Sequence, residues 1–322
     1  MTCFEDLCNA LLFEVFDYLS FNEIVEGFLG LKERFDQAIH SYPALIDVSK
    51  TSENILRGKG PFQCRTLMMH SDASKEFIHN IGSYINFRSI RAIDFHYVDE
   101  YSALSILNEL PMERLESIKM SRLSGEVHVG SILQQIWSLI AIAGRNQLEY
   151  LNVQLGLVCE DEAQLLSDLP SVKRATLTDV SDSELFMFCC HASNLCSLVV
   201  SATYFTSNID MSDLKLFQLT HLSLVIQKRS SAKSVHQFLS KCPNLTDLEL
   251  RYWYSRVDHE MLDCERWQSL IEQHLQRLSH LSIRIFRYIS IEPDTYYEYR
   301  YEKSEFWSEN KPLFQIKVKL LL

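Results

Sequence analysis

Residues 245–250 read Leu-Thr-Asp-Leu-Glu-Leu, a hexad whose first, fourth and sixth positions are leucine. The same spacing, with conservative apolar replacements, recurs in hexads that begin at Cys64, Ile90, Leu115, Leu148, Val172, Leu195, Leu219 and Leu278. A weaker copy carries Leu313, Ile316 and Val318. Because alternate side chains of a strand point to opposite faces, each hexad predicts a short strand with one buried face.

Six of the eight gaps between successive hexads are 23 to 26 residues long, and two are 33. This period is typical of leucine-rich repeats, in which each unit is one strand and a returning helix. At 322 residues the chain is also longer than a single core usually supports, a limit that repeat arrays avoid. We therefore expect an α/β fold, a leucine-rich-repeat solenoid or horseshoe over residues 46–322, with extended C-terminal repeats and its helices outside.

Residues 1–45 lack the hexad and read as three short helices. Ser20 and Glu23 have the spacing of a capping box, which predicts the start of the second helix. The third has apolar residues at four-residue spacing, namely Leu31, Phe35 and Ile39. So small a domain cannot bury all its apolar side chains internally. The surplus predicts either a cap on the first repeat or a docking site for another protein.

The stretch 4–24, FEDLCNALLFEVFDYLSFNEI, resembles the F-box, whose pattern is Leu-Pro-x-x-Leu-Leu-x-x-Ile-Phe-x-Tyr-Leu-x-x-x-Asp-Leu. The match covers Leu7, Leu11, Leu12, Val15, Phe16, Tyr18, Leu19 and Ile24. Two positions depart from the family pattern: Cys8 stands where the family usually has proline, and Glu23 where it usually has aspartate.

The resemblance implies a non-enzymatic substrate receptor. Its F-box-like bundle, residues 1–45, would bind a Skp-type adaptor that links the chain to a cullin-RING ubiquitin ligase. The matching residues expected at that contact are Leu7, Cys8, Leu11, Leu12, Val15 and Phe16. The alternative is a leucine-rich-repeat scaffold or inhibitor whose N-terminal helices act only as a cap, with no link to ubiquitin.

The remainder of the chain would hold a protein substrate whose identity the sequence does not give. Between Tyr252 and Trp307 there are 12 aromatic residues in 56 positions, about twice the chain's 11%. Arginines accompany them, and both residue types are enriched at binding hot spots. The expected substrate-binding residues are Arg251, Tyr252, Trp253, Tyr254, His280 and Arg284. The competing interpretation is that these aromatic side chains fill a terminal core or cap.

Charge and hydropathy argue against several classes of partner. A net charge of −11 opposes the basic surface that nucleic acids require, and no run of eighteen apolar residues predicts a membrane span. Residues 132–143 are instead expected to form a buried helix. Glu5 and Asp6 stand where a secretory signal would carry basic charge. We expect a cytoplasmic or nuclear protein that binds neither nucleic acid nor membrane.

Catalytic signals are few. The nine cysteines include no C-x-x-C pair, and no phosphate-binding glycine motif is present. Cys189-Cys190-His191 and the run from His259 to Cys264 place thiols near histidines, but neither has an established zinc or nucleophile spacing. The cysteines are expected to be reduced, and most of them to lie in the core. We therefore expect no enzyme activity, no cofactor and no metal.

Overall fold

The structure is a computed structural model that describes residues 7–51, 53–57, 61–71, 73, 80–121, 130–154, 169–203, 205, 211–212, 214–227, 230–254, 263–288, 306–307 and 314–321. The chain forms two compact units, Met1–Leu148 and Glu149–Leu322. The predicted domain boundary near residue 45 lies inside the first unit. A separate domain over residues 1–45 stays a prediction.

The first unit begins with three helices and continues as a parallel sheet. Its helices are α1 (Asn9–Phe16), α2 (Phe21–Phe28), α3 (Glu33–Ser41), α4 (Glu53–Leu56), α6 (Glu100–Glu109) and α7 (Gly130–Asn146). Its strands are β1 (Ala44–Asp47), β2 (Phe62–His70), β3 (Ile85–Asn86), β4 (Ala92–His96) and β5 (Ser117–Ser121). Strands β1, β2, β4 and β5 pair in chain order, and the short β3 pairs with β2.

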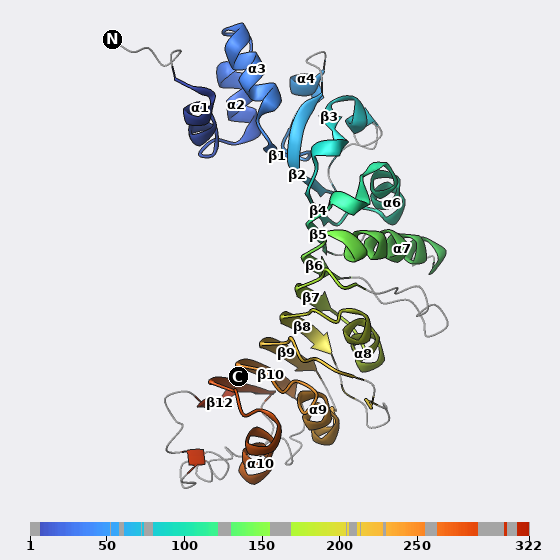
Figure 1. Ribbon diagram of the computed structural model, residues 1–322, viewed down its shortest axis with the longest axis vertical. Helices are drawn as coiled ribbons and strands as arrows, with labels where there is room; N and C mark the ends of the chain where they lie inside the picture. Colours follow the sequence, from blue (N-terminus) through green and yellow to red (C-terminus); the bar gives the residue numbers. More distant parts are fainter. Residues whose placement is uncertain are drawn as a thin grey trace. The chain divides into compact units, whose positions relative to one another are not determined.

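The second unit is a parallel sheet with helical connections. Its strands are β6 (Tyr150–Val153), β7 (Arg174–Thr178), β8 (Ser197–Thr203), β9 (His221–Gln227), β10 (Asp247–Tyr254), β11 (His280–Tyr288) and β12 (Phe314–Leu321). Its helices are α8 (Asp182–His191), α9 (Ala232–Leu239) and α10 (Cys264–His274). Each strand pairs with the next one in the chain, and the three helices lie on one side of the strands (Figure 1).

The predicted leucine-rich-repeat horseshoe is wrong. The chain is an α/β structure built on all-parallel pairing with helical connections, and it divides into two units. Each hexad does coincide with a strand: Leu248 and Leu250 are buried in β10, whereas Asp247 and Glu249 between them are partly exposed. The hexad therefore specifies alternate burial beside a parallel neighbour, which parallel α/β sheets provide in general. It does not specify the curvature of a horseshoe.

The N-terminal helices pack on one another and on the edge of the first sheet. Phe16 is fully buried and meets Phe28 and Tyr42, each with 5.4 Å between ring centroids. Phe62 of β2 is also fully buried, against Phe21 at 5.2 Å and against the stacked ring of His40 at 4.7 Å. The helices thus cover Phe62 and share a core with the first sheet.

Local signals at helix starts agree with the sequence. Ser20 and Glu23 form the predicted capping box of α2, and Ser181 and Glu184 form another at α8. Helix α7 contains the predicted buried stretch, including the fully buried Ile136. Across the described part of the chain, no helix combines the length and the apolar character needed to cross a membrane.

Two strand-to-helix turns share a left-handed residue directly after the strand. Tyr97 follows β4 with φ 55°, and Asp179 follows β7 with φ 58°. Their backbone N–H groups donate to the carbonyls of Ser121, at 3.0 Å, and Ser201, at 2.9 Å, which extends the parallel ladder by one bond. A buried valine and a capping residue then start the helix in both places. This conformation is unfavourable for a bulky side chain such as tyrosine.

Candidate functional site

The outward-facing residues of β8 to β11 form a mostly polar surface on the second unit, here named the polar strip. Its members are Ser197, Val199, His221, Ser223, Asp247, Glu249, Arg251, His280, Ser282 and Arg284. Strand register places Ser197, His221, Asp247 and His280 in one row. The next row is Val199, Ser223, Glu249 and Ser282, and Arg251 pairs with Arg284 one step further on.

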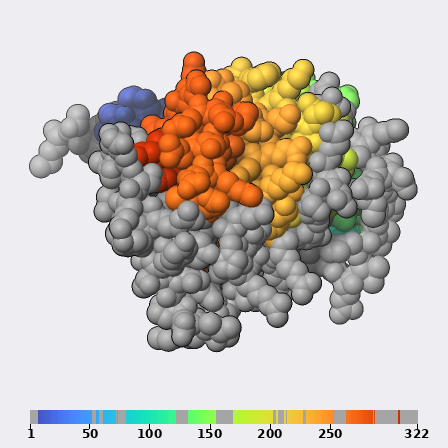
Figure 2. Space-filling model, turned by 90° about the horizontal axis from the view of Figure 1, so that it is seen from below, coloured from blue at the N-terminus to red at the C-terminus, as the bar shows by residue number. Residues whose placement is uncertain are grey.

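The strip is hollowed rather than flat. A shallow depression of about 390 Å³ is lined by residues of all four strands, from Ser197 to Arg284. Figure 2 views the molecule from below, where described residues of the second unit, coloured from yellow to orange, form a packed surface. The alternation of the hexads exposes these polar side chains while the leucines between them are buried.

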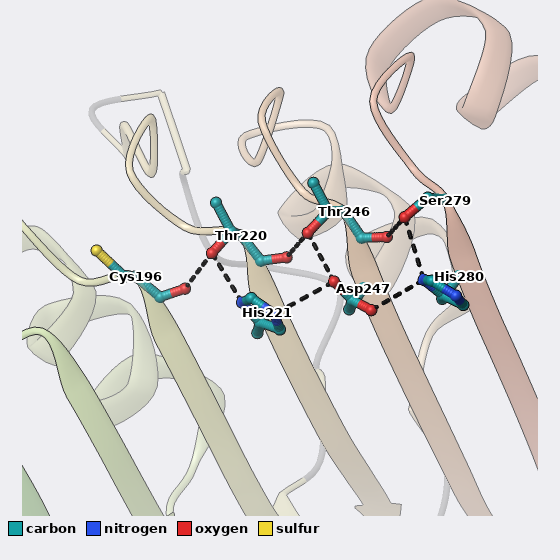
Figure 3. A network of polar contacts seen from close by, with 7 residues as sticks. All are labelled: Cys196, Thr220, His221, Thr246, Asp247, Ser279 and His280. Carbon is teal, nitrogen blue, oxygen red and sulfur yellow. Dashed lines mark hydrogen bonds and ion pairs between the residues drawn. The ribbon is translucent and has the colours of Figure 1, made fainter.

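Asp247 lies between two histidines in the first row (Figure 3). Its Oδ2 is 3.3 Å from Nε2 of His221, and its Oδ1 is 3.1 Å from Nδ1 of His280. The histidine side chains are 60% and 68% exposed, so both are accessible to a partner. One carboxylate therefore serves two imidazole rings at the surface.

Behind this row, hydroxyl groups connect each strand to the preceding one. Thr220 Oγ1 donates to the Cys196 carbonyl at 3.0 Å, Thr246 Oγ1 to the Thr220 carbonyl at 3.0 Å, and Ser279 Oγ to the Thr246 carbonyl at 3.1 Å. We name this series the hydroxyl ladder (Figure 3). The backbone N–H of each of these three residues donates to the same carbonyl as its hydroxyl. The ladder fixes the backbone from which His221, Asp247 and His280 project.

The ladder also contacts the ring of His221. Its Nδ1 is 2.8 Å from Thr220 Oγ1, and its Nε2 is 3.3 Å from Asp247 Oδ2. The Thr220 hydroxyl has a single proton, and the tautomer of His221 decides whether that proton is donated to Nδ1 or to the Cys196 carbonyl.

In the second and third rows, Glu249 holds the two arginines. Nε and a terminal nitrogen of Arg251 lie 3.0 and 2.9 Å from Glu249 Oε1. A terminal nitrogen of Arg284 is 3.7 Å from the same oxygen, too far for a hydrogen bond. Ser223 Oγ donates to the other oxygen at 3.3 Å. Arg251 is therefore fixed by Glu249, whereas Arg284 is held only by charge.

The order Thr220, His221 and Asp247 places a hydroxyl, an imidazole and a carboxylate in series, as in nucleophilic hydrolases. The contact is better explained as structural. The Thr220 hydroxyl lies 3.0 Å from a main-chain carbonyl, and the equivalent hydroxyls of Thr246 and Ser279 lie as close to theirs, although Thr246 Oγ1 is closer still to Asp247 Oδ2, at 2.7 Å. A hydroxyl repeated at successive strands for backbone bonding is not specifically activated.

The predicted substrate-binding residues have different locations. Arg251, His280 and Arg284 lie together on the polar strip. Tyr252 is only 3% exposed, because it shares the buried side of β10 with Leu248 and Leu250. The side chains of Trp253 and Tyr254 lie outside the described residues. The prediction omitted His221, Asp247, Ser223 and Glu249, although their positions between hexad leucines mark them as outward-facing.

The predicted adaptor-binding residues divide into core and surface. Leu12 and Phe16 are fully buried, Leu7 and Val15 are partly buried, and Cys8 is exposed. Leu11 is 44% exposed. Two further side chains of this region, Tyr18 at 91% and Leu31 at 63%, are also exposed.

A second polar cluster lies on the outward face of β2, β4 and β5 in the first unit. Asp94 contacts Lys119 at 2.8 Å and His96 at 2.8 Å, and the ring of His70 stacks on His96 with 4.8 Å between centroids. Lys119 Nζ is also 3.2 Å from Nε2 of His96. Asp94 and Lys119 form the charged pair of this cluster, whereas the buried Asp94 Oδ1 contacts His96 but makes no hydrogen bond within the described part of the chain.

Metal and thiol chemistry find little support in the described residues. These residues contain no group of three or more His, Cys, Asp or Glu side chains that could hold a metal ion. Burial raises the pKa of the Cys64 thiol to about 12 and also raises the pKa values of Cys189 and Cys242. Cys8 and Cys190 are exposed cysteines, and the stretch 259–262 of the second predicted thiol–histidine run is not described.

The sequence matches no protein-family model and no curated protein. The polar strip and the N-terminal helices must therefore be interpreted from their own chemistry.

Proposed function

We propose that the protein is a non-enzymatic, two-part protein-binding adaptor: the substrate-recognition subunit of a cullin-RING ubiquitin ligase of the F-box type. In this proposal the N-terminal helices dock on a Skp-type adaptor, and the polar strip of the second unit holds a protein substrate. The proposal combines the F-box-like sequence pattern with two accessible surfaces on the chain.

The observation that carries the proposal is the exposure of large apolar groups on and beside the N-terminal helices. Leu11, Tyr18 and Leu31 are exposed, whereas Leu12 and Phe16 of the same helix as Leu11 form its buried side. Helix α1 therefore keeps one large apolar side chain, Leu11, outside the buried core. Exposed leucine and tyrosine side chains are suited to burial against a partner protein.

The polar strip supplies the second surface. Its arginines and histidines project from strands fixed by the hydroxyl ladder, so little conformational entropy is lost when they contact a partner. An adaptor of this kind needs no catalytic group. Holding a substrate near a ubiquitin-charged enzyme raises the effective concentration of the substrate's lysines.

Capture of a purified Skp-type adaptor by the full chain tests the proposal. We expect Leu11→Asp to reduce capture at least ten-fold, because it places a charge in an apolar interface. Ile142→Asp is the matched control, since Ile142 is a similarly exposed apolar residue on α7. No capture by the unmodified chain, or equal capture by both variants, would remove the proposal.

The alternative is a scaffold or inhibitor protein whose N-terminal helices are only a cap. The contacts of Phe21 and His40 with the buried Phe62 favour it, because they show that these helices cover the first sheet. Deleting residues 1–45 cannot separate the two functions, since the deletion would expose Phe62 in either case. The cap function alone predicts that Leu11→Asp changes neither stability nor any protein interaction.

A further inference from the structure

The polar strip carries no net charge, although the protein as a whole is acidic. The whole chain has a formal net charge of −11. On the strip, Asp247 and Glu249 are balanced by Arg251 and Arg284, which gives a sum of zero before His221 and His280 are counted. An acidic partner is repelled by most of this protein's charge but not by the strip.

We propose that the polar strip binds an acidic, extended segment of a protein partner, and that protonation of His221 and His280 tightens this binding. The inference rests on the proposed function in one respect: it takes the second unit to be the arm that holds the partner. It adds the chemical class of the partner segment and the means by which its affinity is regulated.

Arg284 is the anchor for a carboxylate. It lies 3.7 Å from Glu249 Oε1 and makes no hydrogen bond there, and its side chain is 44% exposed. A guanidinium group presents several N–H donors in a planar fork that matches a carboxylate in a two-bond arrangement. Arg251, already fixed by Glu249, presents its remaining donors beside it through the register of β10 and β11.

The two histidines set the charge of the strip. Asp247, Glu249, Arg251 and Arg284 sum to zero, and protonation of both imidazole rings raises the total to +2. The ring of His280 turns Nδ1 toward Asp247 and Ser279, so its Nε2 lies on the opposite side of the ring, where a partner can reach it. Ser197 of β8, the fourth strand in this row, carries no charge that opposes the change.

The dimensions fit an extended peptide that crosses the strands. Residues from β9 to β11 are separated by two strand spacings, or roughly 10 Å, which an extended chain covers in about three residues. His280 and Arg284 lie four positions apart along β11, roughly 13 Å, so an acidic run of about five residues that lies obliquely over the strands can meet both histidines and both arginines. The depression of about 390 Å³ along this path accommodates their side chains.

The test is fluorescence anisotropy with the full-length protein and a labelled octapeptide of glutamate, between pH 5.5 and 8.0. An octapeptide of glutamine is the neutral control. We expect the glutamate peptide to bind and its affinity to rise about three- to ten-fold toward pH 5.5, the range in which imidazole groups gain their protons. The glutamine peptide should show no binding.

Variants assign the effect to named side chains. The double substitution Arg251→Gln and Arg284→Gln should weaken binding at every pH, with Arg277→Gln as the control at an exposed arginine outside the strip. The pair His221→Gln and His280→Gln should lose the rise in affinity on acidification, so that its affinities at pH 5.5 and pH 8.0 are equal. The control for that pair is His274→Gln, at an exposed histidine on α10.

A third variant should bind the glutamate peptide more tightly, a result that misfolding of the variant cannot produce. Asp247→Asn keeps the shape of the side chain and removes one negative charge, so it should tighten glutamate binding about two- to five-fold. Absence of glutamate binding, or a pH dependence that survives in the double histidine variant, overturns the inference. If adaptor capture persists when glutamate binding fails, only this inference is lost. If the protein binds glutamate but does not capture the adaptor, the ubiquitin-ligase proposal is wrong and the polar strip is still the binding site for an acidic segment.

Discussion

The ring of Phe21, on α2, meets the ring of Phe62, on β2, edge to face with 5.2 Å between centroids. This contact joins a helix whose start is defined by a capping box to the strand that contains the first hexad. The N-terminal helices and the first sheet therefore share a core. Their stabilities should be coupled.

Phe62→Ala should lower the free energy of unfolding of the protein by about 3–5 kcal/mol, because Phe62 of β2 is fully buried against α2 and α3. Urea unfolding followed by circular dichroism measures the change. Phe217→Ala, at an exposed phenylalanine of the second unit, should change it by less than about 0.5 kcal/mol. Equal effects of the two substitutions would contradict the shared core.

Asp47 should make stability depend on pH. Burial raises its pKa, but the hydrogen bonds from Ser49 and the contact with Lys50 lower it more, so the net pKa is below the ordinary value. A carboxyl whose pKa falls on folding contributes stability above its unfolded pKa, near 3.9, and loses it as pH falls through the folded value.

Asp47→Asn should therefore be less stable than the unmodified protein at pH 7, and the difference should shrink as the pH falls below about 4. Urea midpoints at pH 7, 5, 4 and 3 provide the measurement. Asp36→Asn, at a helix residue whose Oδ1 accepts from the Gly30 backbone, is a useful comparison outside β1. A constant difference between Asp47→Asn and the unmodified protein at all four pH values would show that the carboxyl is not linked to folding.

Tyr97→Gly should raise the stability of the first unit. Tyr97 has φ 55°, which costs a residue with a side chain about 1 kcal/mol or more and costs glycine little. Part of the gain is offset by the flexibility of glycine in the unfolded chain, which leaves about 0.5 kcal/mol. Thermal unfolding provides the measurement.

Tyr101→Gly is the matched control, because Tyr101 is also an exposed tyrosine but lies within α6. It should lose about 1 kcal/mol, the usual cost of glycine inside a helix. If both substitutions destabilise the protein equally, the Tyr97 side chain contributes contacts that outweigh its backbone conformation.

Thiol reactivity should follow burial. Iodoacetamide at pH 7.5 should modify Cys8 and Cys190 readily and Cys64, Cys189 and Cys242 only after unfolding, because the latter are buried and their pKa values are raised. Mass spectrometry of the labelled peptides, with and without urea, resolves each site. Rapid labelling of Cys64 in the folded protein would revive the idea of a functional thiol.

The strand positions and the polar strip were largely predictable from the sequence. The hexad at Leu245 gives both the buried residues of β10 and, by alternation, the exposed Asp247, Glu249 and Arg251. The same alternation places Tyr252 on the buried side. Its assignment to the binding surface followed the aromatic composition of the segment instead of its position in the strand.

Other features could not be predicted. The curvature expected of a horseshoe depends on how helical connections pack, and the hexad contains no information about them. The left-handed Tyr97 goes against the preference of its residue type, so only tertiary contacts determine it. The pairing of Asp247 with histidines from two other strands depends on register, which spacing along one strand does not define.

The hydroxyl ladder has a consequence for synthesis on the ribosome. Thr220, Thr246 and Ser279 each bind a carbonyl that precedes them in the chain, and each strand from β7 to β12 pairs with a strand already made. At roughly 5–20 residues per second, a new strand emerges every few seconds and finds its template complete. The second unit can therefore assemble in the direction of translation, without waiting for the C-terminus.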